Sequence, residues 1–257
     1  MFVSEEIVSK IKQKLAEIEE KENIRIIHCV ESGSRAWGFA SPDSDYDVRF
    51  VYVRNIRDYL KLEKSRDVIE WELNDVYDIS GWDIRKTFEL LHKSNPTLFE
   101  WNNSPIVYKT TPEWEQIRSI ITDCFMSKTG IYHYLSTAKH NYKAYFTEDE
   151  VKLKKYFYVL RPILAARWII SHGTPPPMLF SELMDAELDE AVRPDVEKLL
   201  DMKMNTSEIG KGKRIKNLDR YISTEMADIQ ILTDSLAAEK PVPWEELDDI
   251  LFSLLGV

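Results

Sequence analysis

Hydrophobic positions near the start of the chain predict a helix followed by two strands. Apolar side chains recur at helical spacing at Ile7, Ile11, Leu15 and Ile18. Residues 24–30 form a short, mostly apolar run, which is typical of a buried strand. Residues 45–53 (DYDVRFVYV) alternate polar with β-branched or aromatic side chains, which predicts a second strand.

A hairpin and a further helix are predicted next. The strand-like runs 68–71 and 76–79 flank Asn74-Asp75, a pair of turn formers. After Asp83 the segment IRKTFELLHKSN has helical spacing, and we expect Asp83 to cap that helix because its carboxylate can accept from the first free backbone N–H groups.

The chain becomes almost entirely helical after Pro112. The periodicity predicts helices at 113–126, 130–146, 151–172, within 208–233 and at 244–255. Pro162 falls inside the third of these and is expected to kink or break it. We therefore expect an α/β (α+β) domain at residues 1–110, followed by a helical domain at residues 111–257 that binds substrate or nucleotide.

Composition narrows the class of protein. Of the 257 residues, 44% are hydrophobic, which is enough to build a core and argues against wholesale disorder. The net charge of −10 disfavours extended binding to duplex DNA, which needs many cations facing phosphates. A local basic patch could still bind a short polyphosphate.

Cysteine content and the distribution of apolar runs predict a cytoplasmic protein. Cys29 and Cys124 are isolated in or beside apolar runs, so we expect buried thiols in a reducing compartment. Residues 1–23 are typical of a charged amphipathic helix and not of a signal peptide. No apolar run approaches the roughly 20 residues that cross a bilayer, so no membrane association is expected.

The chemically informative stretch is GSRAWGFASPDSDYD, residues 33–47. Residues two apart on a strand face the same way, so Asp45 and Asp47 would aim both carboxylates at one point. Their repulsion is relieved by a cation, and Mg²⁺ (or Mn²⁺) suits oxygen ligands and substrate phosphates. Gly33-Ser34 lets the backbone approach a phosphate, and the serine hydroxyl can donate to it.

These motifs resemble a known family. Gly-Ser, ten intervening residues and Asp-x-Asp resemble the signature of the DNA polymerase β superfamily of nucleotidyltransferases. More narrowly, GSRAWGFASPDSDYDVRF, DISGWDIRK, SNPTLFEW with NSPIVY, and KLKKYFYVLRPILAARW resemble the YcgL-type, or RNA-ligase-associated, branch. The resemblance covers residues from about 25 to 180.

The resemblance implies a polymerase-β-like palm with a mixed sheet and three metal-binding, catalytic carboxylates. Two are Asp45 and Asp47, and the third comes from a neighbouring strand. We choose Asp78 within VYDISGWD because it lies on the predicted strand, with Asp83 as the alternative. Glu100 is a weaker candidate.

Basic and aromatic residues in the helical half supply a second candidate feature. Lysines, arginines and tyrosines interleave over residues 134–167, and this surface could bind a triphosphate and stack a base. The alternative is a solvated helix face with tyrosines packed beneath it. We expect nucleotide binding by a set of six residues: Gly33, Ser34, Arg35, Ser44, Lys155 and Arg161.

The expected reaction is a two-metal-ion transfer of an NMP, with AMP from ATP as the first choice, to a hydroxyl acceptor with release of pyrophosphate. The acceptor is left open among an RNA end, a protein and a small molecule, because one fold hosts many reactions. Two alternatives remain: a nucleotide-binding sensor with little turnover, and one partner of a toxin–antitoxin or RNA-repair complex.

Overall fold

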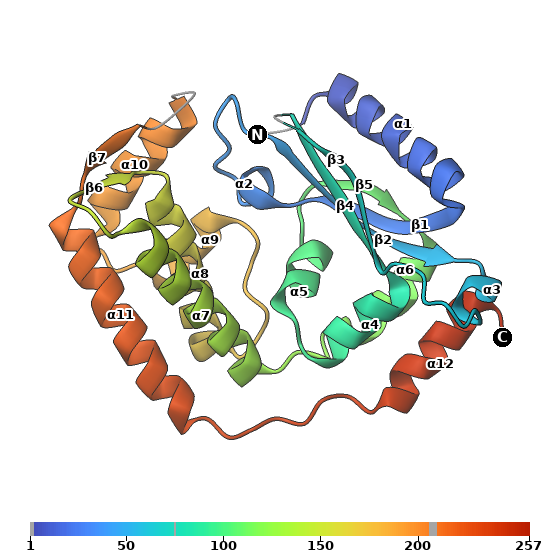
Figure 1. The fold of residues 1–257 in the computed structure, drawn as a ribbon. Coiled ribbons are helices and arrows are strands. Elements are labelled where there is room, and N and C mark those ends of the chain that lie inside the picture. The colour runs from blue at the N-terminus through green and yellow to red at the C-terminus, as the bar shows by residue number, and fades with distance from the viewer. Residues whose placement is uncertain (1–2, 75, 206–209) are drawn as a thin grey trace. The chain divides into compact units, whose positions relative to one another are not determined.

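The computed structural model describes residues 3–74, 76–205 and 210–257, and it divides into two compact units (Figure 1). The sheet unit comprises Met1–Ala36, Asp45–Cys124 and Pro241–Val257. The helical unit comprises Trp37–Ser44 and Phe125–Lys240. This division differs from the expected boundary at residues 110 and 111, because the chain returns to the sheet unit at its end and the segment before Asp45 belongs to the helical unit.

A five-stranded sheet forms the centre of the sheet unit, with the order β3-β4-β2-β1-β5. Its strands are β1 (Ile24–Glu31), β2 (Tyr46–Arg54), β3 (Val68–Leu73), β4 (Tyr77–Asp83) and β5 (Val107–Thr110). Strands β2 and β4 are parallel and all other neighbours are antiparallel. The expected mixed sheet and the α/β class are therefore confirmed, as is the β3–β4 hairpin. Asp75 of its expected turn lies outside the described residues.

Helix α1 (Glu5–Glu22) packs on the sheet through the stripe that the sequence predicts. Ile11, Leu15 and Ile18 are fully or almost fully buried with Phe50 and Ile69 in one apolar cluster. Ser4 caps the helix by accepting from the Ile7 N–H. The unit's other helices are α2 (Gly33–Ala36), α3 (Ile56–Tyr59), α4 (Ile84–His92), α5 (Pro96–Asn102), α6 (Pro112–Ile121) and α12 (Trp244–Leu255).

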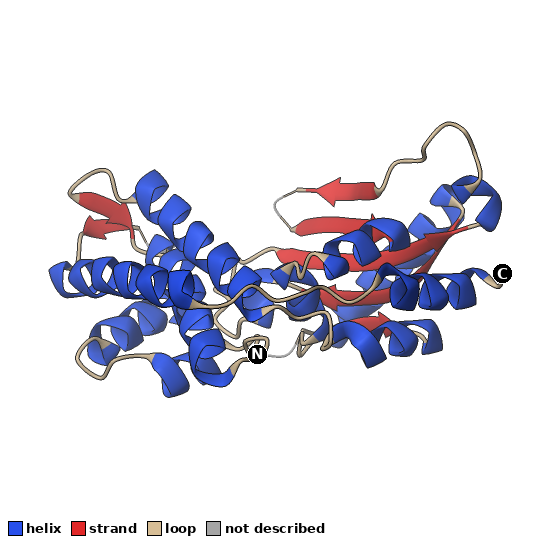
Figure 2. Ribbon diagram, turned by 90° about the horizontal axis from the view of Figure 1, so that it is seen from below, coloured by secondary structure: helices blue, strands red, loops and turns tan. Residues whose placement is uncertain are grey.

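The helical unit is built around α8 (Lys155–His172), which packs against its neighbours α7 and α9. Figure 2, coloured by secondary structure, shows that this unit consists mostly of helices (blue). Eleven residues of α8 are buried, so the helix lies inside the core and not on its surface. Its other elements are α7 (Ser127–Tyr145), α9 (Phe180–Glu187), α10 (Arg193–Asn205), α11 (Lys216–Ser235) and the antiparallel strands β6 (Glu150–Lys152) and β7 (Lys211–Lys213).

Two expected element boundaries in the second half are wrong, at 151–172 and at 113–126. The segment 151–172 begins as strand β6, and its helix starts at Lys155 and continues through Pro162 without a break. The helix expected within 208–233 is present as α11 from Lys216, and it is preceded by residues 211–213, which pair with β6; residues 206–209 lie outside the described part. The helix expected at 113–126 ends at Ile121.

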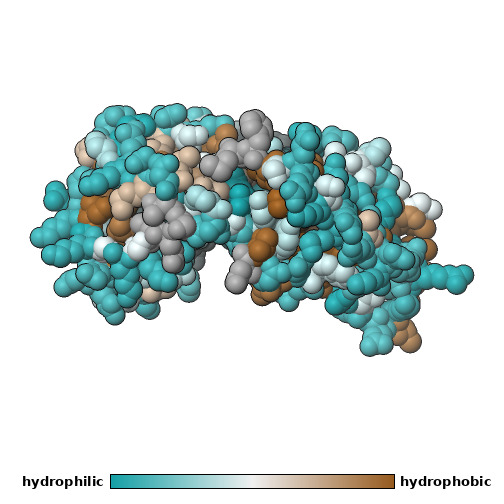
Figure 3. Space-filling model, turned by 90° about the horizontal axis from the view of Figure 1, so that it is seen from above, coloured by the Kyte–Doolittle hydropathy of each residue, from teal (hydrophilic) through white to brown (hydrophobic). Residues whose placement is uncertain are grey.

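The surface in Figure 3 is mostly hydrophilic, in agreement with the charged composition. Cys29 and Cys124 are buried free thiols, as expected. Within the described ranges, no helix has both the length and the apolar character needed to cross a membrane.

Candidate active site

Parallel pairing of β2 with β4 brings two of the predicted carboxylates together. Asp47 lies opposite Asp78 in the register of the two strands. Asp45 directly precedes β2, and its charge acts on Asp47. The structure therefore groups the three acids that the sequence proposed, with Asp47 in the middle.

Asp47 carries the clearest electrostatic signature of this group. The pKa of Asp47 is raised to about 6, chiefly by burial; Arg49 lowers it, and the charges of Asp45 and Asp78 contribute to the rise. A carboxylate with a raised pKa beside two more acids favours a bound cation. The donor set of hard oxygen atoms also suits Mg²⁺ or Mn²⁺.

Gly33 lies directly against the Asp47 carboxylate. It has a φ of +58°, in the left-handed region, and a Cβ atom added there would overlap Asp47 Oδ2. Ser34 follows in the single-turn helix α2. The predicted phosphate loop and the predicted metal carboxylate are thus in contact.

Two other predicted nucleotide-binding residues have different surroundings. Arg35 donates through Nε to the Asp45 carbonyl at 2.9 Å, and its guanidinium lies 3.9 Å from the centre of the Tyr46 ring. Ser44 shares a hydrogen bond with Ser41 between their hydroxyl oxygens, 2.9 Å apart, in the segment that belongs to the helical unit. Arg35 is thus close to the acidic group, whereas Ser44 stabilises a turn.

Glu31 supports the Asp47 backbone and was not predicted from the sequence. Glu31 is fully buried at the end of β1; one carboxylate oxygen accepts from the Asp47 N–H at 3.0 Å and the other from the Tyr108 hydroxyl at 2.5 Å. Burial raises its pKa to about 7, despite these two hydrogen bonds. No local signal reveals this role, because Tyr108 is far along the chain.

Arg49 was also missed, and it bridges two of the acids. Its Nη2 donates to Asp47 Oδ1 at 3.1 Å and to Asp78 Oδ2 at 2.6 Å. Position 49 faces the same way as Asp47 because it is two residues further along the strand. The alternation in DYDVRF therefore contained a usable signal.

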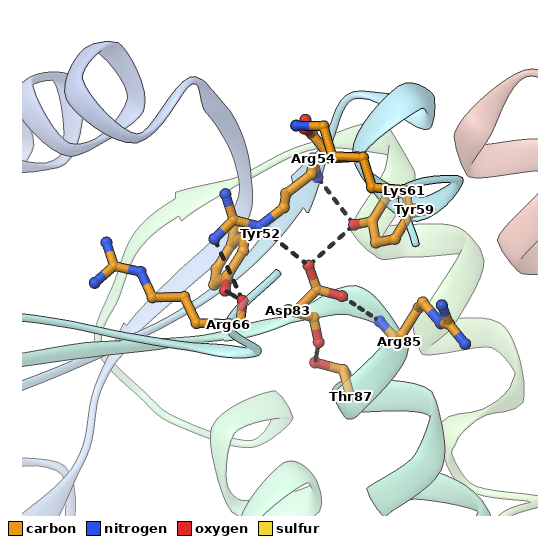
Figure 4. A network of polar contacts seen from close by, with 9 residues as sticks. Tyr52, Arg54, Tyr59, Lys61, Arg66, Asp83, Arg85 and Thr87 are labelled. Carbon is orange, nitrogen blue, oxygen red and sulfur yellow. Dashed lines mark hydrogen bonds and ion pairs between the residues drawn. The ribbon is translucent and has the colours of Figure 1, made fainter. Parts of the chain in front are cut away.

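Asp83, the alternative third carboxylate, lies elsewhere in a separate polar network (Figure 4). It is five residues beyond Asp78 on β4, which corresponds to about 16 Å along a strand. It caps α4 by accepting from the Arg85 N–H at 2.9 Å, as expected, and it accepts from the Tyr59 hydroxyl at 3.1 Å. The geometry favours Asp78 over Asp83 as the partner of Asp47. Glu100 is a half-buried residue of α5.

Lys155 and Arg161 both lie on α8 but in different environments. The Lys155 ammonium is 3.8 Å from the centre of the Tyr145 ring and 4.7 Å from that of Tyr158. Arg161 is buried, and its guanidinium lies 4.5 Å from the centre of the Trp37 ring. Lys155 is the better placed of the two to meet a ligand, and the phosphate role of both stays a prediction.

Among the residues that the structure describes, no three His, Cys, Asp or Glu side chains form a group arranged to hold a metal ion. The Arg49 guanidinium forms ion pairs with both Asp47 and Asp78. The chemistry of Asp45 and Asp47 suits a divalent cation, and the shorter of the two Arg49 contacts is the one to Asp78.

We expect Asp47→Asn to stabilise the metal-free fold at pH 7 and to have little effect at pH 4. Asp47 has a folded-state pKa of about 6, against about 3.9 in an unfolded chain. Between these values the folded protein binds more protons than the unfolded one, so the unfolding free energy falls as pH rises through this window. The Tm difference between variant and wild type in EDTA should therefore be absent near pH 4 and complete above pH 6. Equal Tm values at pH 7 would contradict this reasoning.

Comparison with known proteins identifies the family of this chain. Residues 7–253 match the family described as "RNA repair pathway DNA polymerase beta family", and the chain belongs to that family. It is 45% identical over 246 residues to the protein described as "Uncharacterized protein YcgL" from Bacillus subtilis (strain 168), covering 95% of each chain. The resemblance inferred from the GSRAWGFASPDSDYDVRF stretch is thereby confirmed. A crystal structure of a nucleotidyltransferase-like protein from Exiguobacterium sibiricum 255-15 is 12% identical, covers 95% of this chain and 79% of that one, and has a TM-score of 0.31.

Proposed function

We propose that this protein transfers an NMP, with AMP as the first candidate, from an NTP to a hydroxyl acceptor. The observation that carries the proposal is the contact of Gly33 with the Asp47 carboxylate, in a chain of the polymerase β family. A phosphate-binding turn and an acidic cation site in contact are what a nucleoside triphosphate with its metal requires.

In this reaction the acceptor oxygen attacks the α-phosphorus in line. A bond forms between them, the bond from the α-phosphorus to the β-phosphate bridging oxygen breaks, and pyrophosphate leaves while the hydroxyl proton is released. A divalent cation bound by Asp45 and Asp47 would neutralise phosphate charge and lower the pKa of the hydroxyl. Gly33 and Ser34 would position the triphosphate, so much of the rate enhancement would come from orientation and electrostatics.

The acceptor is proposed by chemical class. The description of the family refers to RNA repair, which makes RNA ends the first acceptors to test. Incubation with each α-labelled NTP, Mg²⁺ or Mn²⁺, and pools of RNA, protein or metabolites would identify the labelled product. Nucleotide binding without pyrophosphate release would instead favour a sensor.

We expect Lys155→Ala to weaken NTP binding by roughly tenfold to a hundredfold, the range for one charge-assisted contact. The two tyrosine rings around the ammonium restrict its motion and prepare it for a phosphate. Affinity for the corresponding nucleoside, which has no phosphates, should change less than twofold. Calorimetric titration measures both, with Lys152→Ala as the control because Lys152 is an exposed lysine on the nearby strand β6.

Two outcomes would contradict the phosphate role of Lys155. If the affinities for nucleoside and NTP fall together, Lys155 supports the fold or a base pocket. If Lys155→Ala and Lys152→Ala behave alike, the basic surface is a solvated face or serves a polyanionic acceptor.

A further inference from the structure

Arg49 is fixed in the acidic group by four hydrogen bonds. Besides Asp47 and Asp78, whose carboxylates accept from Nη2, the carbonyl groups of Asp78 and Val48 accept from Nη1 at 2.6 and 3.2 Å. The side chain is 18% exposed. A guanidinium that donates four hydrogen bonds to backbone and carboxylate oxygens has a fixed position in the site and is not a mobile surface charge.

The position of this guanidinium conflicts with a second metal. A cation that bridged Asp47 and Asp78 would compete with Arg49, which already holds one oxygen of each carboxylate. It would also lie beside the positive charge of Arg49, and because that charge is partly buried, water screens the repulsion poorly. Removing Arg49 from its place would leave the Asp78 and Val48 carbonyl groups without this donor.

The balance of charges in the site also favours a single divalent cation. The carboxylates of Asp45, Asp47 and Asp78 together with Arg49 leave two negative charges, which one divalent cation neutralises. Glu31 and Arg35 also act on Asp47, with opposite signs. The site therefore has charge for one divalent ion, whereas a second would leave it positive before any phosphate binds.

We propose that Arg49 supplies the second positive charge of this site, that Asp78 holds Arg49 in place, and that one divalent cation binds through Asp45 and Asp47. The inference rests on the proposed function and deepens it, because it assigns a different task to each acid. Arg49 is then a positioned cation whose charge stabilises the phosphates, as guanidinium groups do in other phosphoryl transfers. Asp78 becomes a positioning residue.

Counting bound Mn²⁺ tests this directly. Wild-type protein saturated with a non-hydrolysable ATP analogue is titrated with Mn²⁺, and free ion is followed by electron paramagnetic resonance. We expect one Mn²⁺ per complex. Asp78→Asn should keep this count and bind Mn²⁺ within threefold of wild type, while its kcat falls about tenfold because Arg49 loses an anchor. Two Mn²⁺ per wild-type complex, or an affinity loss of tenfold or more in Asp78→Asn, would overturn the proposal.

Two Arg49 variants distinguish the contribution of the positive charge from that of the planar guanidinium shape. Arg49→Met should lower kcat about a hundredfold, and Arg49→Lys, which keeps the charge without the planar fork, should recover part of that loss. Arg57→Met, at an exposed position on α3, is the control and should match wild type. Full activity in a folded Arg49→Met protein would overturn the role of Arg49.

The ion count does not depend on turnover, so failure of this inference is distinguishable from failure of the proposed function. A protein that binds one Mn²⁺ but forms no product with any acceptor would contradict the proposed function alone. A protein that forms product and binds two Mn²⁺ would contradict this inference alone.

Discussion

Asp47→Asn is expected to lower kcat for nucleotidyl transfer by about three orders of magnitude, on the scale of losing an essential charge in a metal-assisted reaction. Asp47 is central to the acidic group: it lies opposite Asp78, contacts Gly33 and accepts from Arg49. The Asn amide preserves the size and one acceptor oxygen, so the fold should persist. Steady-state kinetics at saturating Mn²⁺, together with circular dichroism, measure both effects.

Asp43→Asn is the matched control for this loss. Asp43 is an exposed turn residue four positions before Asp47, and its replacement removes the same charge from the same motif. Its kcat should stay within twofold of wild type. Activity of Asp47→Asn within tenfold of wild type would contradict the assignment of Asp47 to cation binding, whatever happens at Asp43.

Gly33→Val is expected to abolish detectable activity and to weaken NTP binding far more than Ser34→Ala does. Any side chain at residue 33 meets the Asp47 carboxylate, so the substitution displaces a proposed metal ligand in addition to blocking phosphate approach. The positive φ of +58° adds backbone strain. Calorimetric titration with a non-hydrolysable NTP ranks the two variants, and equal losses would mean that the loop is only a turn.

A substitution at a second glycine distinguishes the effect of backbone strain from the effect of the contact with Asp47. Gly173, at the end of α8, has a φ of +66°, and an added Cβ atom there meets nothing within 4 Å. Gly173→Ala should therefore lower Tm by a few degrees, on the order of 1 kcal/mol, and leave nucleotide binding unchanged. Gly33→Ala should lower Tm and also lose NTP affinity. If both alanine variants lose stability but keep the NTP affinity of wild type, the Gly33–Asp47 contact has no functional role.

Local patterns predicted the parts of the fold that depend on neighbours in sequence. The stripe of α1, the alternation of β2 and the Asp83 cap of α4 are all set within a few residues, and the structure contains each of them. The spacing of Gly33, Asp45 and Asp47 likewise indicated a shared site. The contact between Gly33 and Asp47 gives that spacing a steric reason.

Features that depend on distant partners escaped the sequence argument. Strand β6 is three residues long and pairs with residues 211–213 beyond three helices, so its local pattern could not identify it. Glu31 is a buried acid because Tyr108 and the Asp47 backbone surround it. The expected boundary at residue 110 did not include the return of α12 to the sheet unit, because no feature of the local composition indicates it.

The proposed transfer of a nucleotide is tested most directly by following both ends of the broken bond. Wild-type protein is incubated with α-labelled ATP, Mn²⁺ and RNA with free hydroxyl ends, and labelled product and pyrophosphate are measured together. The proposal predicts labelled RNA and pyrophosphate in equal amounts, with neither formed by Asp47→Asn. Inorganic phosphate in place of pyrophosphate, or product formation that persists in Asp47→Asn, would contradict it.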